Sequence, residues 1–283
     1  MSQEFSNTQS IGELISTANQ LSSDQVEKIL AHQKQHGTRF GESAIALGLA
    51  RHEDVVWALS RQFDYPYANE SLSPDLQSAL QPFGLQAEAI RNLRSQLVHV
   101  AAATPVARRP LAVVSPCVGD GKSYICANLA VSLSQMGSRV ALIDADLRTP
   151  RQHKIFGLPG NTQGLSDALA NRGEVNLCVP LPSIPNLFVL PVGTLPPNPS
   201  ELVQRPAFAD LMGLLLNRFD HVIVDTPAAE YGADARVIAQ ICQSALVVGR
   251  PHHTRSRQMD QFVKELQACV GVELVGMVMN QKA

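Results

Sequence analysis

The chain has 283 residues, of which 45% are hydrophobic, enough for one large domain and one small domain with apolar cores. Its net charge of −2 gives no basis for strong nucleic-acid binding. The five cysteines form no C-x-x-C pair, which disfavours a zinc site or disulfide framework and suits a reducing cytoplasm. The polar N-terminus lacks a signal peptide, and no apolar run is long enough to span a bilayer. We therefore expect a cytoplasmic protein that reaches a membrane only through a partner.

The first 66 residues contain an internal repeat. Residues 10–33 align with residues 39–62 at an offset of 29. Each copy predicts a short helix, a turn and a longer amphipathic helix, with Ser23 capping the longer helix of the first copy. We predict a small all-helical domain over residues 1–66, in which the two copies bury their apolar stripes against each other.

The second copy resembles the tandem motif of the cyclic-di-GMP-binding MshE N-terminal domain. Arg39, Gly41 and Gly48 match the R-L-G-x-x-L-[VI]-x-x-G-L-L pattern, whereas Ser10 and Asn19 depart from it in the first copy. The resemblance implies that the arginine and the two glycines contact cyclic-di-GMP. The missing first arginine favours a structural or protein-docking module instead, and both interpretations stay open.

Residues 67–86 mix Ser, Pro and Asn with a short helical stretch, which predicts a linker. A helix is expected from about Ala87, and it carries Glu88, Arg91 and Arg94 at three-residue spacing, roughly on one face. Taken alone, this pattern is explained by a solvated face with an intrahelical ion pair.

Three apolar runs, each typical of a buried parallel strand, then end in residues suited to phosphate or magnesium: VVSPCVGDGKS (113–123), VALIDADLR (140–148) and HVIVDTPA (221–228). The first predicts a phosphate-binding loop, although Pro116 stands where the pattern has its first glycine. Gly119 and Gly121 let backbone amides turn toward phosphate, Lys122 reaches the outer phosphates, and Ser123 can ligate Mg²⁺. The predicted nucleotide-binding residues are Val118, Gly119, Asp120, Gly121, Lys122, Ser123 and Tyr124.

The second and third runs place Asp144, Asp146 and Asp225 at the carboxyl ends of predicted strands, where ligands bind in open α/β sheets. Strands are expected at 111–115, 139–144, 187–191, 220–225, 244–249 and 273–279. Their alternation with helical or loop segments predicts a doubly wound, mostly parallel α/β sheet with right-handed crossovers. His252 and His253 are expected to be exposed turn residues, since no third metal ligand is apparent.

The E-x-x-R-x-x-R helix, the S-P-x-x-G-D-G-K-S loop, and the D-A-D-L-R and V-D-T-P elements occur in that order. Together they resemble the bacterial tyrosine kinases (BY-kinases) of exopolysaccharide export, in particular the EpsG-like chain-length-determinant branch. The resemblance implies a P-loop NTPase domain of the MinD/ParA-like fold over residues 87–283 and an ATP- and Mg²⁺-dependent tyrosine kinase activity.

The resemblance also implies roles for individual residues. Lys122 and the loop amides would bind the ATP phosphates, and Asn280 would contact adenine. Mg²⁺ would be held by Ser123, Asp144 and Asp225, with Asp146 assisting. Asp146 is also the candidate to orient or deprotonate the acceptor hydroxyl. Glu88, Arg91 and Arg94 would make contacts in a homo-oligomeric ring. A membrane chain-length regulator of the polysaccharide co-polymerase type would recruit the kinase to the inner membrane.

One departure concerns the phosphate acceptor. Many of these kinases end in a tyrosine cluster, but this chain ends in VGMVMNQKA and has only Tyr65, Tyr67, Tyr124 and Tyr231. The acceptor is then another tyrosine or another protein. The alternatives are a MinD/ParA-type regulatory ATPase and a catalytically weak nucleotide-sensing scaffold. The ATPase is disfavoured because residues 115–118, Ser-Pro-Cys-Val, lack the second lysine usual in its loop.

Overall fold

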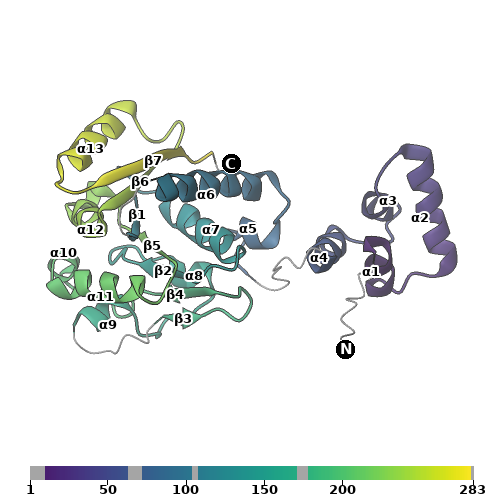
Figure 1. The fold of residues 1–283 in the computed structure, drawn as a ribbon, viewed down its shortest axis with the longest axis horizontal. Helices are drawn as coiled ribbons and strands as arrows, with labels where there is room; N and C mark the ends of the chain where they lie inside the picture. Colours follow the sequence, from purple (N-terminus) through teal and green to yellow (C-terminus); the bar gives the residue numbers. More distant parts are fainter. Residues whose placement is uncertain (1–9, 63–71, 104–107, 171–177, 282–283) are drawn as a thin grey trace.

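The computed structural model describes residues 10–62, 72–103, 108–170 and 178–281. Figure 1 shows two groups of elements, the helices α1–α4 and a larger body built on one sheet. Within these ranges, no helix combines the length and apolar content needed to cross a membrane.

The helical group follows the internal repeat. Its elements are α1 (Ile11–Ala18), α2 (Ser23–His36), α3 (Phe40–Ala46) and α4 (His52–Gln62). The second pair of helices starts 29 residues after the first, as the repeat predicts. The predicted cap was one residue late: Ser22 caps α2, its hydroxyl accepting from Gln25 N while the Gln25 side chain accepts from Ser22 N.

The four helices share a small apolar core of their own. Ile15, Ile29, Ala44 and Ala58, one from each helix, are fully buried in one cluster, and partly buried side chains from α1, α3, α4 and the turns pack around them. The apolar stripes of the two copies therefore cover each other, as an amphipathic repeat requires.

The larger body is a seven-stranded sheet with the strand order β3-β4-β2-β5-β1-β6-β7. Every neighbouring pair is parallel except β3–β4. The strands are β1 (Leu111–Val114), β2 (Val140–Asp144), β3 (Val179–Pro180), β4 (Leu187–Leu190), β5 (His221–Asp225), β6 (Ser244–Gly249) and β7 (Glu273–Met279). All six predicted strands are present, whereas the two-residue edge strand β3 is too short to give a periodic signal.

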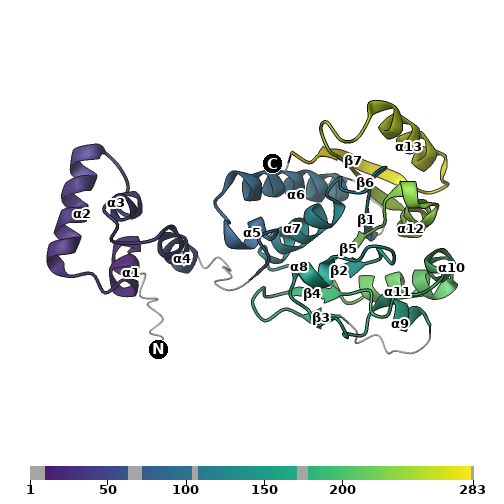
Figure 2. The ribbon, with the colours of Figure 1, turned by 180° about the vertical axis from the view of Figure 1, so that it is seen from behind.

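Helices cover both faces of the sheet (Figures 1 and 2). Central helix α7 (Lys122–Ser134) covers one face, and α5 (Gln77–Leu80) and α6 (Leu85–Ala103) pack on it. The opposite face carries α11 (Pro206–Leu216), α12 (Asp234–Cys242) and α13 (Ser256–Ala268). The remaining short helices are α8 (Gln152–Ile155), α9 (Leu165–Leu169), α10 (Pro199–Val203) and the 3₁₀ turn Ala229–Tyr231.

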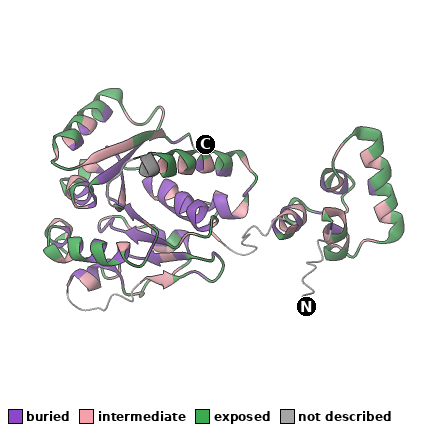
Figure 3. Ribbon diagram, viewed as in Figure 1, coloured by how far each residue is buried: buried purple, intermediate pink, exposed green. Residues whose placement is uncertain are grey.

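Strand pleating sends alternate residues into the two cores. In β1, Ala112 and Val114 belong to the cluster under α11 and α12, while Val113 packs against α7. Both faces of the central strands are therefore apolar, which explains their continuous hydrophobic runs. Figure 3 shows the result, with the central strands and α7 buried inside an exposed shell.

The described part of the predicted linker packs against the sheet-containing body. Leu76 and Ala79 are buried against α7. The Asn128 side chain accepts from Ser78 N at 2.8 Å and donates to the Asp75 carbonyl at 2.8 Å. These buried contacts attach the predicted linker to α7. Helix α6 begins at Leu85, two residues before the expected start.

Candidate functional site

The predicted phosphate loop connects β1 to α7. Gly119 and Gly121 have φ values of +84° and +95°, a region that side chains rarely adopt. A Cβ on Gly121 would lie 1.9 Å from Asn280 Nδ2, so a side chain there would displace the Asn280 amide in addition to straining the backbone. The loop therefore reaches its curvature only with glycine, and its amides stand at the N-terminus of a long helix.

Lys122 opens α7 with its side chain buried and donates from Nζ to Ser115 Oγ at 3.0 Å. Among the described residues, no carboxylate lies within 4.0 Å of its ammonium group. A buried cation beside the positive end of a helix is unfavourable unless an anion accompanies it. The loop and Lys122 together thus fit a phosphate group.

The carboxylates of Asp144 and Asp225 end adjacent parallel strands, are paired in register, and are fully buried. Burial and the negative charge of Asp225 raise the pKa of Asp144 well above its usual range. Burial also raises the pKa of Asp225, although hydrogen bonds from Ser123 and Gln152 oppose this shift. Within the described part of the chain, the Asp225 Oδ1 atom has no hydrogen-bond partner. Two crowded carboxylates with one unsatisfied oxygen, beside a serine hydroxyl, suit a divalent cation with oxygen ligands.

The third aspartate is held differently. Asp146 accepts hydrogen bonds from Thr149 N and Thr149 Oγ1, both at 2.8 Å, and from Arg148 N at 3.1 Å. These bonds fix the carboxylate at the edge of the cleft, where it is 5% exposed. Asp146 is nearly buried as well, but unlike Asp144 and Asp225 it lines the cleft, where a ligand can reach it.

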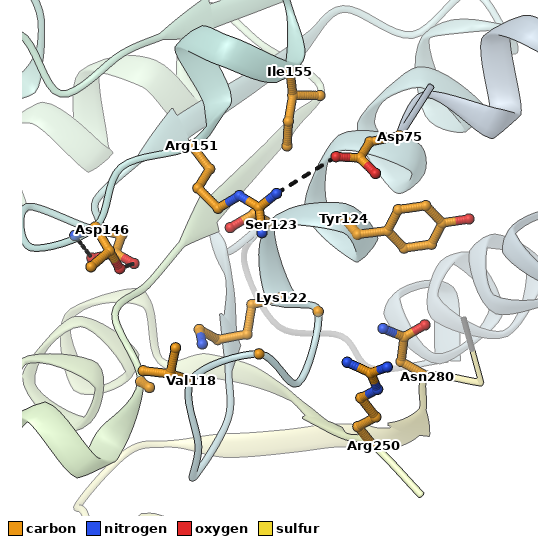
Figure 4. Close-up of a pocket in the computed structure, with 14 residues that line it drawn as sticks. Asp75, Val118, Lys122, Ser123, Tyr124, Asp146, Arg151, Ile155, Arg250 and Asn280 are labelled. Atoms are coloured by element: carbon orange, nitrogen blue, oxygen red, sulfur yellow. Dashed lines mark hydrogen bonds and ion pairs between the residues drawn. The ribbon is translucent and has the colours of Figure 1, made fainter. Parts of the chain in front are cut away.

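These elements line one cleft of about 420 Å³. Figure 4 shows Lys122, Ser123 and Asp146 around it, with Tyr124 and Asn280 at the right of the view. Predicted site residues in the lining are Val118, Gly119, Gly121, Lys122, Ser123, Tyr124, Asp146 and Asn280. Asp144 and Asp225 lie beneath the lining, buried between the strand ends.

Asp120 was predicted to bind nucleotide, but its side chain points into the protein. Its carboxylate accepts from Cys117 N at 3.0 Å and Thr254 Oγ1 at 2.6 Å, and lies 3.1 Å from His253 Nδ1. The Asn280 side chain also supports the loop, donating from Nδ2 to the Asp120 carbonyl at 3.0 Å. These contacts fix the loop conformation from behind.

The structure adds residues that the sequence motifs did not indicate. The cleft is also lined by Asp75, Thr149, Arg151, Ile155, Ala228 and Arg250. Arg151 lies three residues beyond D-A-D-L-R, so that motif was a signal for its neighbourhood. Asp75 is far from every motif in the sequence, and only the packing of residues 72–80 on α7 brings it here.

The E-x-x-R-x-x-R helix is partly engaged within the subunit. Arg91 pairs with Glu88 and donates to the Pro82 carbonyl. Arg94 turns toward α7 and donates to the Ser132 carbonyl at 2.7 Å. Glu88 remains exposed, so the three side chains do not present one common outward face.

The candidate cyclic-di-GMP residues are in the helical group. Arg39 is exposed at the start of α3. A Cβ on Gly41 would lie 2.7 Å from Val55 Cγ1, and Gly48 has a φ of +67° after α3. Helix packing and a turn therefore account for both glycines without a ligand.

Comparisons with known proteins extend over the sheet-containing body. A family model described as ParA, NUBPL iron-transfer P-loop NTPase, matches residues 107–283. The chain is 33% identical over 201 residues to the putative tyrosine-protein kinase CapB of Staphylococcus aureus, a match covering 71% of this chain and 86% of CapB. It is 34% identical over 199 residues to the tyrosine-protein kinase Wzc of Salmonella typhimurium, covering 70% of this chain but 27% of Wzc.

A solved structure gives the same result. The chimerical protein CapA2B2 is 32% identical, with a TM-score of 0.68, and the match covers 79% of this chain and 97% of the chimera. The doubly wound, mostly parallel fold expected from the sequence is confirmed.

Proposed function

This chain belongs to the bacterial tyrosine-protein kinases within the ParA-like P-loop NTPases, and we propose that it is an ATP- and Mg²⁺-dependent protein-tyrosine kinase of exopolysaccharide export. One observation carries the assignment of the site. A buried lysine with no carboxylate at ion-pair distance in the described structure lies beside two crowded, buried carboxylates at the ends of β2 and β5. This arrangement calls for an anion and a cation together, as Mg²⁺-nucleotide supplies.

The residues act by position and charge. Bound ATP supplies the phosphoryl group, and Mg²⁺ neutralises its developing charge. Lys122 and the loop amides hold the phosphates in place. Ser123, Asp144 and Asp225 hold the cation directly or through water. Asp146, at the edge of the cleft, orients or deprotonates the acceptor hydroxyl.

The test is Lys122→Met, with Lys154→Met as a matched control because Lys154 is an exposed lysine outside the cleft. Calorimetry measures MgADP binding, and phosphosite mapping after incubation with ATP measures transfer to tyrosine. We expect Lys122→Met to lose both MgADP binding and transfer to tyrosine, and Lys154→Met to keep both. Undiminished transfer by Lys122→Met would overturn the site assignment.

A second candidate is a MinD/ParA-type regulatory ATPase, which would need no acceptor among the four tyrosines of the chain. Of the four tyrosines, Tyr65 and Tyr67 lie outside the described residues. Tyr124 is about half-buried, which raises its pKa, and Tyr231 is 40% exposed. ATP hydrolysis without phosphotyrosine on this chain or on a partner's cytoplasmic segment would support the ATPase.

The partners follow from the family. We expect a membrane chain-length regulator of the polysaccharide co-polymerase type to recruit the chain to the inner membrane and stimulate it in trans. A solved structure that this chain resembles is a chimerical protein, CapA2B2, which supports a kinase that works together with a second protein. Glu88, Arg91 and Arg94 would contribute to a homo-oligomer. Adding the regulator's cytoplasmic segment should raise ATP turnover, and an unaffected rate would count against this partner.

The domain boundaries are also proposed. A helical repeat domain ends near residue 66, and the buried contacts of Leu76 and Ala79 move the start of the kinase domain from residue 87 to about residue 72. For the repeat domain we favour protein docking over cyclic-di-GMP binding, because packing accounts for Gly41 and Gly48. Calorimetry with cyclic-di-GMP decides: heat with the wild type that is lost in Arg39→Ala would establish the dinucleotide instead.

A further inference from the structure

An arginine outside the predicted motifs extends over the cleft. Arg151 precedes α8, and its backbone N donates to Asp144 Oδ2 at 3.2 Å. Its main chain is thus anchored to one of the carboxylates assigned to the metal. Its side chain is 63% exposed and extends toward Asp75, as Figure 4 shows.

Asp75 meets this arginine from another wall of the cleft. The Arg151 Nη2 and Asp75 Oδ2 atoms are 3.7 Å apart. The Asp75 carbonyl accepts from Asn128 Nδ2, and the next turn is fixed by Ser78 N donating to the same asparagine. The carboxylate therefore stands on anchored backbone, whereas the arginine has a long and exposed side chain.

Asp75 and a bound nucleotide would interact with the Arg151 guanidinium to different degrees. An ion pair this long and this exposed contributes little, because water screens it and the arginine loses rotamer freedom. A nucleotide polyphosphate carries more charge and several acceptor oxygens, which suit the planar donor fork of arginine. Phosphates held by the loop beside Ser123 would therefore compete well with Asp75 for Arg151.

We propose that Arg151 is a further phosphate-contacting residue of the nucleotide site, and that Asp75 is a positioning residue that holds the guanidinium at the cleft mouth until nucleotide binds. This inference rests on the proposed function. On binding, Arg151 leaves the carboxylate for the phosphates and covers the side of the cleft opposite Lys122.

The test is MgADP affinity of the full chain by calorimetry. Arg151→Ala should weaken binding about ten- to a hundredfold, the value of a charge-assisted hydrogen bond. Arg151→Lys should recover part of the loss. Lys154→Ala, which removes an exposed cation outside the cleft from the short helix that follows Arg151, should stay within about twofold of wild type.

Asp75→Asn gives a prediction of opposite sign. Releasing the arginine should tighten MgADP binding by up to about fivefold. The gain should disappear in the Arg151→Ala background, because the carboxylate acts through that side chain. A gain in MgADP affinity that persists in the Arg151→Ala background would show that Asp75 acts on the nucleotide directly. Weaker binding by Asp75→Asn alone would show a structural role for Asp75. Either result overturns the positioning role.

The outcomes separate this inference from the proposed function. If wild type binds no MgADP, or Lys122→Met binds as well as wild type, the nucleotide site itself fails. If Lys122→Met loses binding while Arg151→Ala binds like wild type, only the role of Arg151 is overturned. Thermal unfolding without nucleotide confirms that each variant is folded.

Discussion

Asp225→Asn should stabilise the nucleotide-free protein while weakening its binding of MgADP. Asp225 is fully buried beside Asp144, and burial raises its pKa from 3.8 to about 6. Each pKa unit corresponds to about 1.4 kcal/mol, so ionising this carboxyl in the folded state costs on the order of 3 kcal/mol. Asparagine occupies nearly the same volume without the charge, and it also relieves the repulsion that raises the pKa of Asp144.

The sign of the pH dependence follows from the raised pKa. The folded protein binds a proton at Asp225 more tightly than the unfolded chain does, so acid favours folding. The destabilisation grows as pH rises from about 4 and is complete above the folded pKa of about 6. The difference between variant and wild type should therefore be roughly twice as large at pH 8 as at pH 5.

Part of the expected gain is lost, because the hydrogen bond from Gln152 Nε2 to Asp225 at 2.8 Å is no longer charge-assisted. A net gain of about 1–3 kcal/mol remains, which raises Tm by roughly 2–10 °C for a domain of this size. The assay is thermal unfolding at pH 5 and pH 8 without nucleotide or Mg²⁺. Asp260→Asn, an exposed change on α13, is the control.

MgADP calorimetry on the same samples should show weaker binding by Asp225→Asn, since a cation ligand is lost. An unchanged or lower Tm at pH 8 would refute the crowded-carboxylate argument. Equal stabilisation at both pH values would show that the gain in stability does not come from removing the charge of Asp225.

Three further outcomes are expected. Gly121→Ala should abolish MgADP binding, because the new Cβ would lie 1.9 Å from Asn280 Nδ2 in a backbone conformation with a φ of +95°. Calorimetry measures the binding, and normal affinity would exclude the observed loop conformation. Arg94→Ala should lower the Tm of the subunit, because it removes the hydrogen bond from Arg94 to the Ser132 carbonyl on α7. Glu88→Ala should reduce only the oligomer mass measured by light scattering. Equal effects of the two variants on Tm would contradict the structure. Gly41→Ala should destabilise the helical group by about 1–3 kcal/mol, because the Cβ would lie 2.7 Å from a valine methyl on α4; chemical unfolding of the full chain, followed by the single tryptophan in α4, measures it.

The sequence by itself determined what depends on local periodicity and on short-range chemistry. The continuous apolar runs located the six longer strands, and the 29-residue repeat located the four N-terminal helices. The glycine–lysine–serine loop and the aspartates at strand ends were identifiable because parallel strands bring their carboxyl ends to one edge of the sheet. The cap of α2 was misplaced by one residue because Ser22 and Ser23 are equally suitable by composition, and only the capping geometry selects Ser22.

Only the tertiary structure decided which side chains meet across long sequence separations. Residues 72–80 carry a linker-like composition, yet Leu76 and Ala79 are buried against α7, and this packing brings Asp75 to Arg151 at the nucleotide cleft. Likewise, Asp120 points away from the predicted ligand because Thr254 and Cys117 N provide its hydrogen bonds. A local pattern fixes where the chain turns and which residues are polar, but the direction of a polar side chain depends on partners that the fold supplies from elsewhere in the chain.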